Sequence, residues 1–152
     1  MCQNQAGIIL VTGPTGSGKT TTLYTLLRHL QVSERGMIVT LEDPVEKHMS
    51  GIRQSSINEA AGYTFAKGLK AVLRQDPDII LVGEIRDENT AAIAIEAAYT
   101  GHLVLASLHT HDIRSTLLRL KTLGTDPFLL GYALKGIIAQ KLTPVVCQCQ
   151  SR

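Results

Sequence analysis

Gly13-Pro-Thr-Gly-Ser-Gly-Lys-Thr20 follows an apolar run at residues 7–11 and precedes a stretch typical of a helix at residues 21–30. A buried strand that ends in a glycine-rich turn and continues as a helix directs successive backbone N–H groups at an anion, which lies at the positive end of the helix. The order therefore predicts a phosphate-binding loop between a strand and a helix.

The loop predicts a site for a nucleoside triphosphate. Lys19 would reach the β- and γ-phosphates, and the Thr20 hydroxyl would bind the magnesium ion that bridges them. The alternative is a glycine-rich turn that binds no ligand. The residues expected to contact the nucleotide are Gly13, Pro14, Thr15, Gly16, Ser17, Gly18, Lys19, Thr20 and Thr21.

Composition limits the choice of partners. The chain has 152 residues, which is about one domain with its own core. Charged residues make up 18% and the net charge is +2, so no direct nucleic-acid partner is expected. Cys2, Cys147 and Cys149 stand near the two ends and form no disulfide framework, which favours a cytoplasmic compartment. Because we find neither an export signal nor a long uncharged apolar stretch, we expect a soluble chain.

Short apolar runs alternate with helical patterns, which is typical of parallel strands joined by crossover helices. We predict strands at residues 8–11, 37–41, 79–82 and 103–108, and a short edge strand or loop at 52–57. Further helices are predicted at residues 64–73, from the cap Asp87 through Tyr99 to Gly101, and from Asp126-Pro127. The expected fold is α/β, with three layers and a mostly parallel central sheet, in a single domain over residues 1–152.

Two carboxylates follow predicted strands at what would be the carboxyl edge of the sheet. Glu84 comes after the strand 79–82 and Gly83, and Glu42 comes directly after the strand 37–41. Ligands of open α/β sheets bind at this edge. We predict that Glu84 is the Walker B acid, which holds the metal, and that Glu42 activates water. The alternative is that these acids cap helices or lie in solvated loops.

Histidines flank the strand 103–108. His109 follows it and could hydrogen-bond the γ-phosphate or a catalytic carboxylate, whereas His102 precedes it at the opposite end. We predict His109 as a catalytic residue that senses phosphate, with a structural interface histidine as the alternative. Ligand type alone also allows a zinc site of His109, His111, Cys147 and Cys149, although Cys-Gln-Cys is not a usual spacing.

These segments together resemble the secretion ATPase superfamily, specifically the motors of type II secretion, type IV pilus assembly and competence pseudopili. Four ordered motifs carry the resemblance: the loop 13–20 with Thr21-Thr-Leu-Tyr24, the aspartate box Leu41-Glu-Asp-Pro-Val-Glu46, the Walker B stretch 73–87, and the histidine box from Thr100-Gly-His102 to His109-Thr-His-Asp112. The Walker B stretch is the most specific, because a Leu-Arg pair, Pro-Asp, a four-residue apolar strand and Gly83-Glu-Ile-Arg-Asp87 stand at the family's spacing.

The resemblance implies a RecA-like P-loop fold and a magnesium-dependent ATPase. It further implies a homo-hexameric ring at the cytoplasmic face of the inner membrane, where ATP hydrolysis drives pilin-like subunits and a membrane platform protein is the partner. Lys19 and Thr20 then bind phosphate and Mg²⁺, Glu42 and Glu84 catalyse, and His109 senses phosphate. Arg53, Arg74 and Arg86 either act across a subunit boundary as arginine fingers do, or are ordinary surface arginines.

The sequence also departs from the family's pattern. His111 stands where the family generally has asparagine, and residues 48–53 are unusual after the aspartate box. We expect the chain to be the ATPase core alone, without the family's N-terminal domain and C-terminal extension. Residues 138–142 resemble the family's Ala-Gln-Arg-Leu segment, but Pro144-Val-Val-Cys-Gln-Cys149 replaces the basic-cysteine continuation, and three cysteines leave no tetracysteine zinc pattern.

Several functions remain in competition. The favoured one is assembly for type II secretion or type IV pili, and a pilus retraction motor or a conjugation-type traffic ATPase is its nearest rival. A second hypothesis is a nucleotide-gated interaction module that binds Mg-ATP without turnover. A DNA-translocating motor is less favoured, because two phenylalanines, four tyrosines and no tryptophan leave little for stacking bases.

Overall fold

The computed structural model describes residues 6–33 and 36–144. Its centre is a sheet of six strands in the order β3-β2-β4-β5-β1-β6, and every neighbouring pair is parallel. The strands are β1 (Gly7–Thr12), β2 (Ile38–Glu42), β3 (Arg53–Ser56), β4 (Ile79–Val82), β5 (Leu103–Leu108) and β6 (Leu134–Ala139). All strands therefore end at the same edge of the sheet, where the predicted site residues follow them.

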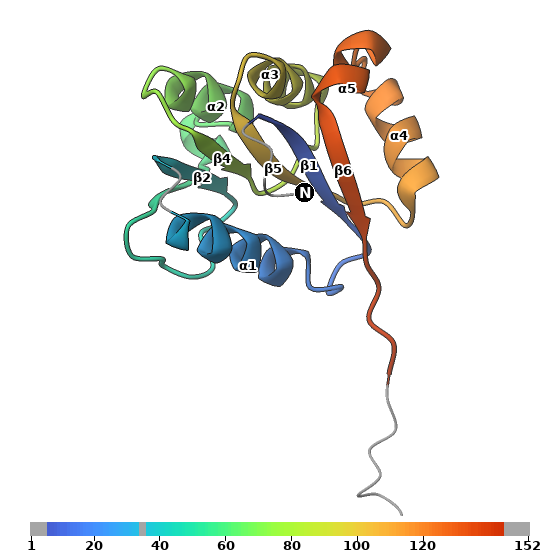
Figure 1. The fold of residues 1–152 in the computed structure, drawn as a ribbon, viewed down its shortest axis with the longest axis horizontal. Helices are drawn as coiled ribbons and strands as arrows, with labels where there is room; N and C mark the ends of the chain where they lie inside the picture. Colours follow the sequence, from blue (N-terminus) through green and yellow to red (C-terminus); the bar gives the residue numbers. More distant parts are fainter. Residues whose placement is uncertain (1–5, 34–35, 145–152) are drawn as a thin grey trace, which may run out of the picture.

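Helices cover both faces of the sheet unequally. They are α1 (Lys19–Val32), α2 (Phe65–Leu73), α3 (Glu88–Tyr99), α4 (Ile113–Thr122) and α5 (Pro127–Ala133), with a short 3₁₀ turn η1 (Glu59–Ala61). Among the described residues, α1 is the one helix on its face, whereas α2, α3, α4 and α5 lie on the other (Figure 1). The three-layer α/β expectation is confirmed.

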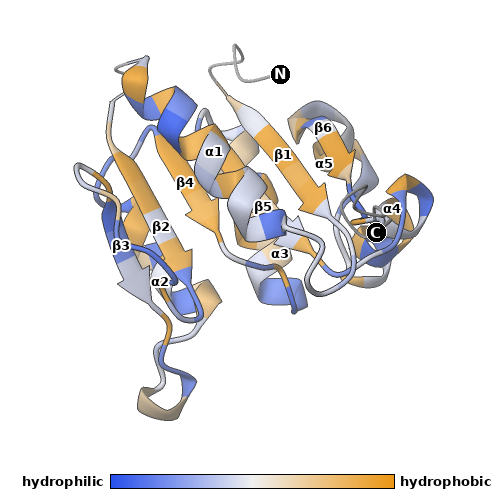
Figure 2. Cartoon of the chain, turned by 90° about the horizontal axis from the view of Figure 1, so that it is seen from below, coloured by the Kyte–Doolittle hydropathy of each residue, from blue (hydrophilic) through white to orange (hydrophobic). Residues whose placement is uncertain are grey.

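Strand residues alternate between two apolar cores. Ile8 and Leu10 of β1 pack with α2 and α3, whereas Ile9 and Val11 pack against Leu27 and its neighbours on α1. A strand covered on both faces has no polar side, which explains the continuous apolar runs. Figure 2 shows this as orange along β1, β4 and β5, whereas the edge strand β3 is pale to blue.

Most predicted elements are found close to their expected positions. The strands at 79–82 and 103–108 have the predicted bounds, 8–11 extends to Gly7–Thr12, and 37–41 is shifted to Ile38–Glu42. The segment 52–57 is the edge strand β3. The Asp87, Thr64 and Asp126 side chains accept hydrogen bonds from the backbone of the first turns of α3, α2 and α5, as helix caps do.

Three elements were not predicted, namely the 3₁₀ turn η1, the helix α4 and the edge strand β6. β6 starts directly after α5 and pairs with β1, so β1 lies inside the sheet with a neighbour on each side. In the part of the chain that the structure describes, no helix has the length and apolar character to cross a membrane.

Candidate functional site

The phosphate loop has the backbone shape that its glycines predict. Gly16 and Gly18 have φ of 77° and 86°, a left-handed conformation that residues with a Cβ adopt only at a cost. Gly13 has no room for a side chain, because a Cβ there would lie 2.3 Å from the Gln140 carbonyl oxygen and 2.5 Å from Ser17 Oγ. Each glycine is therefore required by conformation or by close contact.

The phosphate loop leads into the N-terminus of α1, which has no side-chain cap. Gly18 is the N-cap of α1 and makes no side-chain cap hydrogen bond, and the first turn contains no acidic residue. The first N–H groups of a helix have no partner within it, and they carry the positive end of the helix dipole. This terminus can therefore bind an anion through several N–H groups at once.

Lys19 lies inside the loop. Its Nζ donates to the carbonyl oxygens of Gly13 at 2.9 Å and Pro14 at 3.1 Å, and only 8% of the residue is exposed. Burial lowers the pKa of Lys19, and the negative charge of Glu84 partly opposes that shift. The ammonium group is thus held at the mouth of the loop, with acceptors that an anion could replace.

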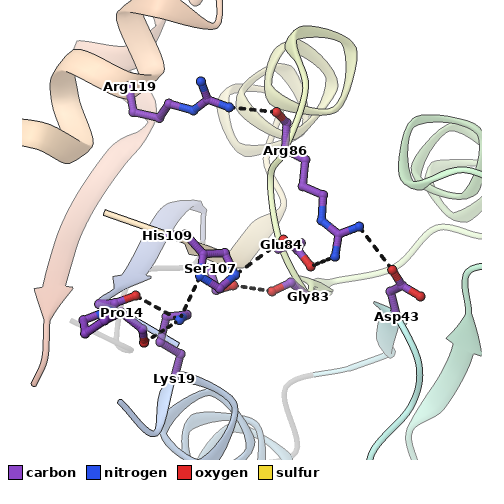
Figure 3. Close-up of polar contacts among 10 residues, drawn as sticks. Pro14, Lys19, Asp43, Gly83, Glu84, Arg86, Ser107, His109 and Arg119 are labelled. Carbon is purple, nitrogen blue, oxygen red and sulfur yellow. Dashed lines mark hydrogen bonds and ion pairs between the residues drawn. The ribbon is translucent and has the colours of Figure 1, made fainter. Parts of the chain in front are cut away.

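His109 connects the loop to the predicted Walker B acid. Its Nδ1 lies 3.4 Å from Lys19 Nζ, and its Nε2 lies 3.5 Å from Glu84 Oε2 (Figure 3). An ammonium group can only donate, so Nδ1 is the accepting nitrogen and Nε2 the one that can carry a proton toward Glu84. The structure therefore brings together three predicted residues from three different segments.

Glu84 is also held from the other side. Its Oε1 accepts from the Arg86 guanidinium, whose second nitrogen lies 3.3 Å from Asp43 Oδ2. The hydrogen bond that Arg86 donates to Glu84 is the largest influence that raises the pKa of Arg86. Arg119 in turn donates to the Arg86 carbonyl oxygen at 3.0 Å (Figure 3). Arg86 is thus engaged within its own chain's site.

Glu42 is buried at the end of β2, and its carboxylate accepts hydrogen bonds from three side chains. Thr40 Oγ donates to Oε1 at 2.5 Å, Gln54 Nε2 donates to the same oxygen at 3.2 Å, and the Tyr24 hydroxyl donates to Oε2. Glu42 is 4% exposed. Burial, the hydrogen bond to Glu42 and the Glu42 charge raise the pKa of Tyr24 to about 12. The sequence interpretation missed the roles of Gln54 and Tyr24, although Tyr24 belongs to the quoted motif.

A chain of buried hydroxyl groups runs behind the site. Thr12, the last residue of β1, bonds through Oγ to the Thr110 carbonyl at 2.8 Å and to the Thr110 hydroxyl. The Thr110 hydroxyl lies 2.7 Å from that of Thr116, which donates to the Asp112 carbonyl at 2.7 Å. The base of the phosphate loop is therefore joined to the residue next to His109 and to α4.

A cavity of about 410 Å³ lies between these elements, within the size range of small-molecule sites. It is lined by Thr15, Gly16, Gly18, Lys19, Thr20, Thr21, Leu23, Tyr24, Glu42, Asp43, Pro44, Glu46, Phe65, Leu81, Gly83, Glu84, Ser107 and His109. An uncapped helix terminus, a buried cation and left-handed glycines fit a phosphate chain. Thr20 and Glu84 offer the oxygen ligands that Mg²⁺ prefers.

Other predicted residues lie elsewhere. The His102 imidazole contacts the Ala97 carbonyl oxygen at the opposite edge of the sheet. Arg53 begins β3, opposite Val39, and Arg74 is the exposed C-cap of α2, so neither is at the cavity.

The zinc alternative receives no support from the described part of the chain. Cys147 and Cys149 lie outside the described residues, and among those described no group of three metal-ligating side chains occurs. His109 contacts Lys19 and Glu84 instead. His111 is exposed.

The sequence and the fold of the chain are similar to those of known proteins. The model of the family described as type II/IV secretion system protein matches residues 1–152. Type II secretion system protein E of Pectobacterium carotovorum is 56% identical over 141 residues, covering 93% of this chain and 28% of that protein. The type IV pilus assembly ATPase TfpB of Acinetobacter baylyi is 53% identical over 147 residues, covering 97% of this chain and 25% of that protein.

A solved structure extends the similarity to the fold. The pilus retraction motor PilT with bound ADP superimposes with a TM-score of 0.87 at 39% identity, covering 94% of this chain and 44% of that one. The RecA-like P-loop fold expected from the sequence is thereby confirmed. The chain spans about a quarter of the length of the curated relatives named above.

Proposed function

Because the chain belongs to the type II/IV secretion system protein family, we propose that residues 1–152 act as an ATP-hydrolysing motor domain that powers type II secretion or type IV pilus assembly. The observation that carries the proposal is the contact chain Lys19–His109–Glu84, which joins a phosphate loop to a carboxylate across one cavity. Phosphoryl transfer needs little beyond such positioning and electrostatic stabilisation.

Each side chain has a distinct role in the proposed reaction. The N–H groups at the start of α1 and the Lys19 ammonium bind the phosphates and stabilise the charge that develops on them. Thr20 and Glu84 hold Mg²⁺, which when bound neutralises phosphate charge. Glu42 orients and deprotonates the attacking water, and its three donors keep the carboxylate in one orientation. His109 detects the γ-phosphate through its contact with Lys19.

The wider assembly is part of the same proposal. We infer a homo-hexamer at the cytoplasmic face of the inner membrane that acts on a membrane platform protein, with ATP as the nucleotide and no direct nucleic-acid partner. The support is membership of the family together with the relatives' names, which refer to type II secretion and to type IV pilus assembly. A retraction motor is the nearest alternative, since PilT shares the fold at 39% identity.

The test is steady-state phosphate release from Mg-ATP as a function of protein concentration. Lys19→Ala and Glu84→Gln remove the phosphate cation and the metal-binding carboxylate, and Glu96→Gln on the exposed side of α3 is the matched control. We expect release by the wild type and the control, with activity per molecule rising with concentration, and loss of release in both site variants.

The same assay separates turnover from binding. If the wild type releases no more phosphate than Lys19→Ala at any concentration, the proposal of an independent ATPase is wrong. ADP binding measured by calorimetry then distinguishes the remaining possibilities. Binding that Lys19→Ala abolishes would identify a nucleotide-gated interaction module, and absence of binding would contradict a nucleotide site altogether.

A further inference from the structure

The end of the edge strand β6 is attached to the phosphate loop from behind. β6 runs beside β1 and ends next to the loop that leads into α1 (Figure 1). Gln140 follows the last residue of β6, and its backbone N–H donates to the Thr12 carbonyl at 2.9 Å. Its side-chain amide donates to the Ser17 carbonyl at 2.5 Å. One residue thus bonds to both ends of the loop.

These two bonds fix the orientation of the loop's peptide groups. In a planar trans peptide the C=O and the following N–H point in opposite directions. Because the Ser17 carbonyl points at Gln140, the N–H of Gly18 points away from Gln140. Gly18 lines the cavity, so an N–H group that points away from Gln140 is available to an anion bound there. A hydrogen bond on one side of the loop therefore sets a donor on the other.

Packing reinforces the hydrogen bonds. The Gln140 carbonyl oxygen occupies the space that a Cβ of Gly13 would need, and its amide nitrogen lies 3.3 Å from the position of a Cβ at Gly18. The loop therefore closes against Gln140 because it has glycine at both positions. Lys141, by contrast, is exposed, and its side chain has no hydrogen bond to residues 6–33 or 36–144.

We propose that Gln140 is a positioning residue of the phosphate loop, which holds the Ser17–Gly18 peptide so that its N–H group binds nucleotide phosphate. The inference rests on the proposed function, since it assigns a role within that site. The strand β6 then has a second role besides pairing with β1, because it positions the residue that bonds to the phosphate loop.

The experiment measures ADP affinity of the 152-residue chain by calorimetry in the wild type and in Gln140→Met. Methionine has a similar length and shape but no donor. Loss of one net hydrogen bond predicts ADP binding weaker by about three- to tenfold. Lys141→Met introduces the same residue at the next position, which is exposed, and this variant should bind ADP like the wild type.

A purely structural role would give a different pattern. It would lower the melting temperature without ligand and leave the affinity of the folded protein unchanged, so both quantities are measured on the same samples. Gln140→Asn, which keeps the amide but draws it back by one methylene, should weaken ADP binding similarly and covers the case in which Gln140→Met fails to fold.

The outcomes separate the inference from the function on which it rests. A wild type that binds ADP while the folded Gln140 variants bind it equally well overturns the positioning role and leaves the nucleotide site standing. A wild type that binds no ADP overturns the proposed function and this inference with it. Weaker binding in the Gln140 variants, with Lys141→Met unchanged, supports both.

Discussion

Replacing Tyr24 by phenylalanine removes one of the three hydrogen bonds that hold Glu42, together with the long 3.4 Å hydrogen bond from the Lys47 backbone N–H to the same hydroxyl. The change removes the hydroxyl that donates to Oε2 and keeps the ring, while Thr40 and Gln54 continue to hold Oε1. A hydrogen bond to a charged group contributes about 1.5–3 kcal/mol, and the partial exposure of Tyr24 favours the lower end. We expect a free energy of unfolding about 1.5 kcal/mol lower, and a melting temperature lower by about 3–6 °C for a chain of this size.

The pH dependence of this loss has a definite sign. The pKa of Tyr24 is raised from 10.0 to about 12 in the folded chain, so folding favours the neutral phenol. The stabilisation is fully present below pH 10 and is lost as the pH rises from 10 toward 12. The stability difference between the wild type and Tyr24→Phe should therefore be constant from pH 7 to about 9.5 and shrink above pH 10.

The assay is urea unfolding across that pH range, followed by circular dichroism. Tyr99→Phe is the control, because Tyr99 is 53% exposed and its hydroxyl has no hydrogen bond to any residue that the structure describes. Combining Tyr24→Phe with Glu42→Gln should give less than the sum of the two single losses, since both remove part of one charged hydrogen bond. Equal stability of the wild type and Tyr24→Phe at pH 7, or a difference that persists unchanged to pH 11, would refute this reasoning.

Other changes should separate tight positions from open ones. Gly13→Ala should abolish nucleotide binding and markedly lower the melting temperature, because its Cβ would meet the Gln140 backbone. The Cβ of Gly16→Ala would meet no described atom within 4 Å and should cost only about 1–2 kcal/mol of left-handed strain, so comparable losses at the two positions would contradict the contact argument. Thr116→Val should destabilise by about 0.5–1.5 kcal/mol in chemical unfolding, because it removes one of the two hydroxyl partners of Thr110, whose hydroxyl keeps its contact with Thr12. A neutral result would mean that the bond between Thr110 and Thr116 adds no stability. Arg86→Ala should change the free energy of unfolding by no more than about 1 kcal/mol, since the Arg86 side chain is 51% exposed. It should nevertheless lower phosphate release, because the Glu84 carboxylate is no longer held in place. Unchanged release would show that this ion pair has no role in turnover.

Sequence patterns predicted the strands whose position depends on the local sequence alone. The strands at 79–82 and 103–108 have the expected bounds because continuous apolar runs between turn residues leave little choice of ends. β6 was missed because Leu134-Lys-Gly-Ile-Ile-Ala139 contains Lys and Gly and follows α5 without a turn. Its conformation depends on pairing with the edge of β1, which is a tertiary contact.

The sequence predicted the site residues that lie in the phosphate loop or follow a strand, but not the residues that hold them in place. Lys19 was predicted in the phosphate loop, and Glu84 and His109 were predicted after the ends of two strands. The structure brings the three residues into contact. Glu42 lies at the same cavity, but its donors come from a helix and an edge strand whose positions no local pattern specifies. Gln140 belonged to a quoted segment, yet its contact with Ser17 required knowing that β6 neighbours β1.

The unequal layering of the sheet links nucleotide affinity to local opening of the fold. Within the described residues α1 is the one helix on its face, and Leu23, Leu27 and Leu30 cover that face from a helix whose first residue is Lys19. A nucleotide that binds only when the phosphate loop is folded stabilises the folded form, and this stabilisation grows with the logarithm of the nucleotide concentration. Amide protons along α1 and on the strands beneath it would then exchange with solvent at rates that fall together as nucleotide is added. One of the two apolar cores would thus report on a site at one end of a single helix.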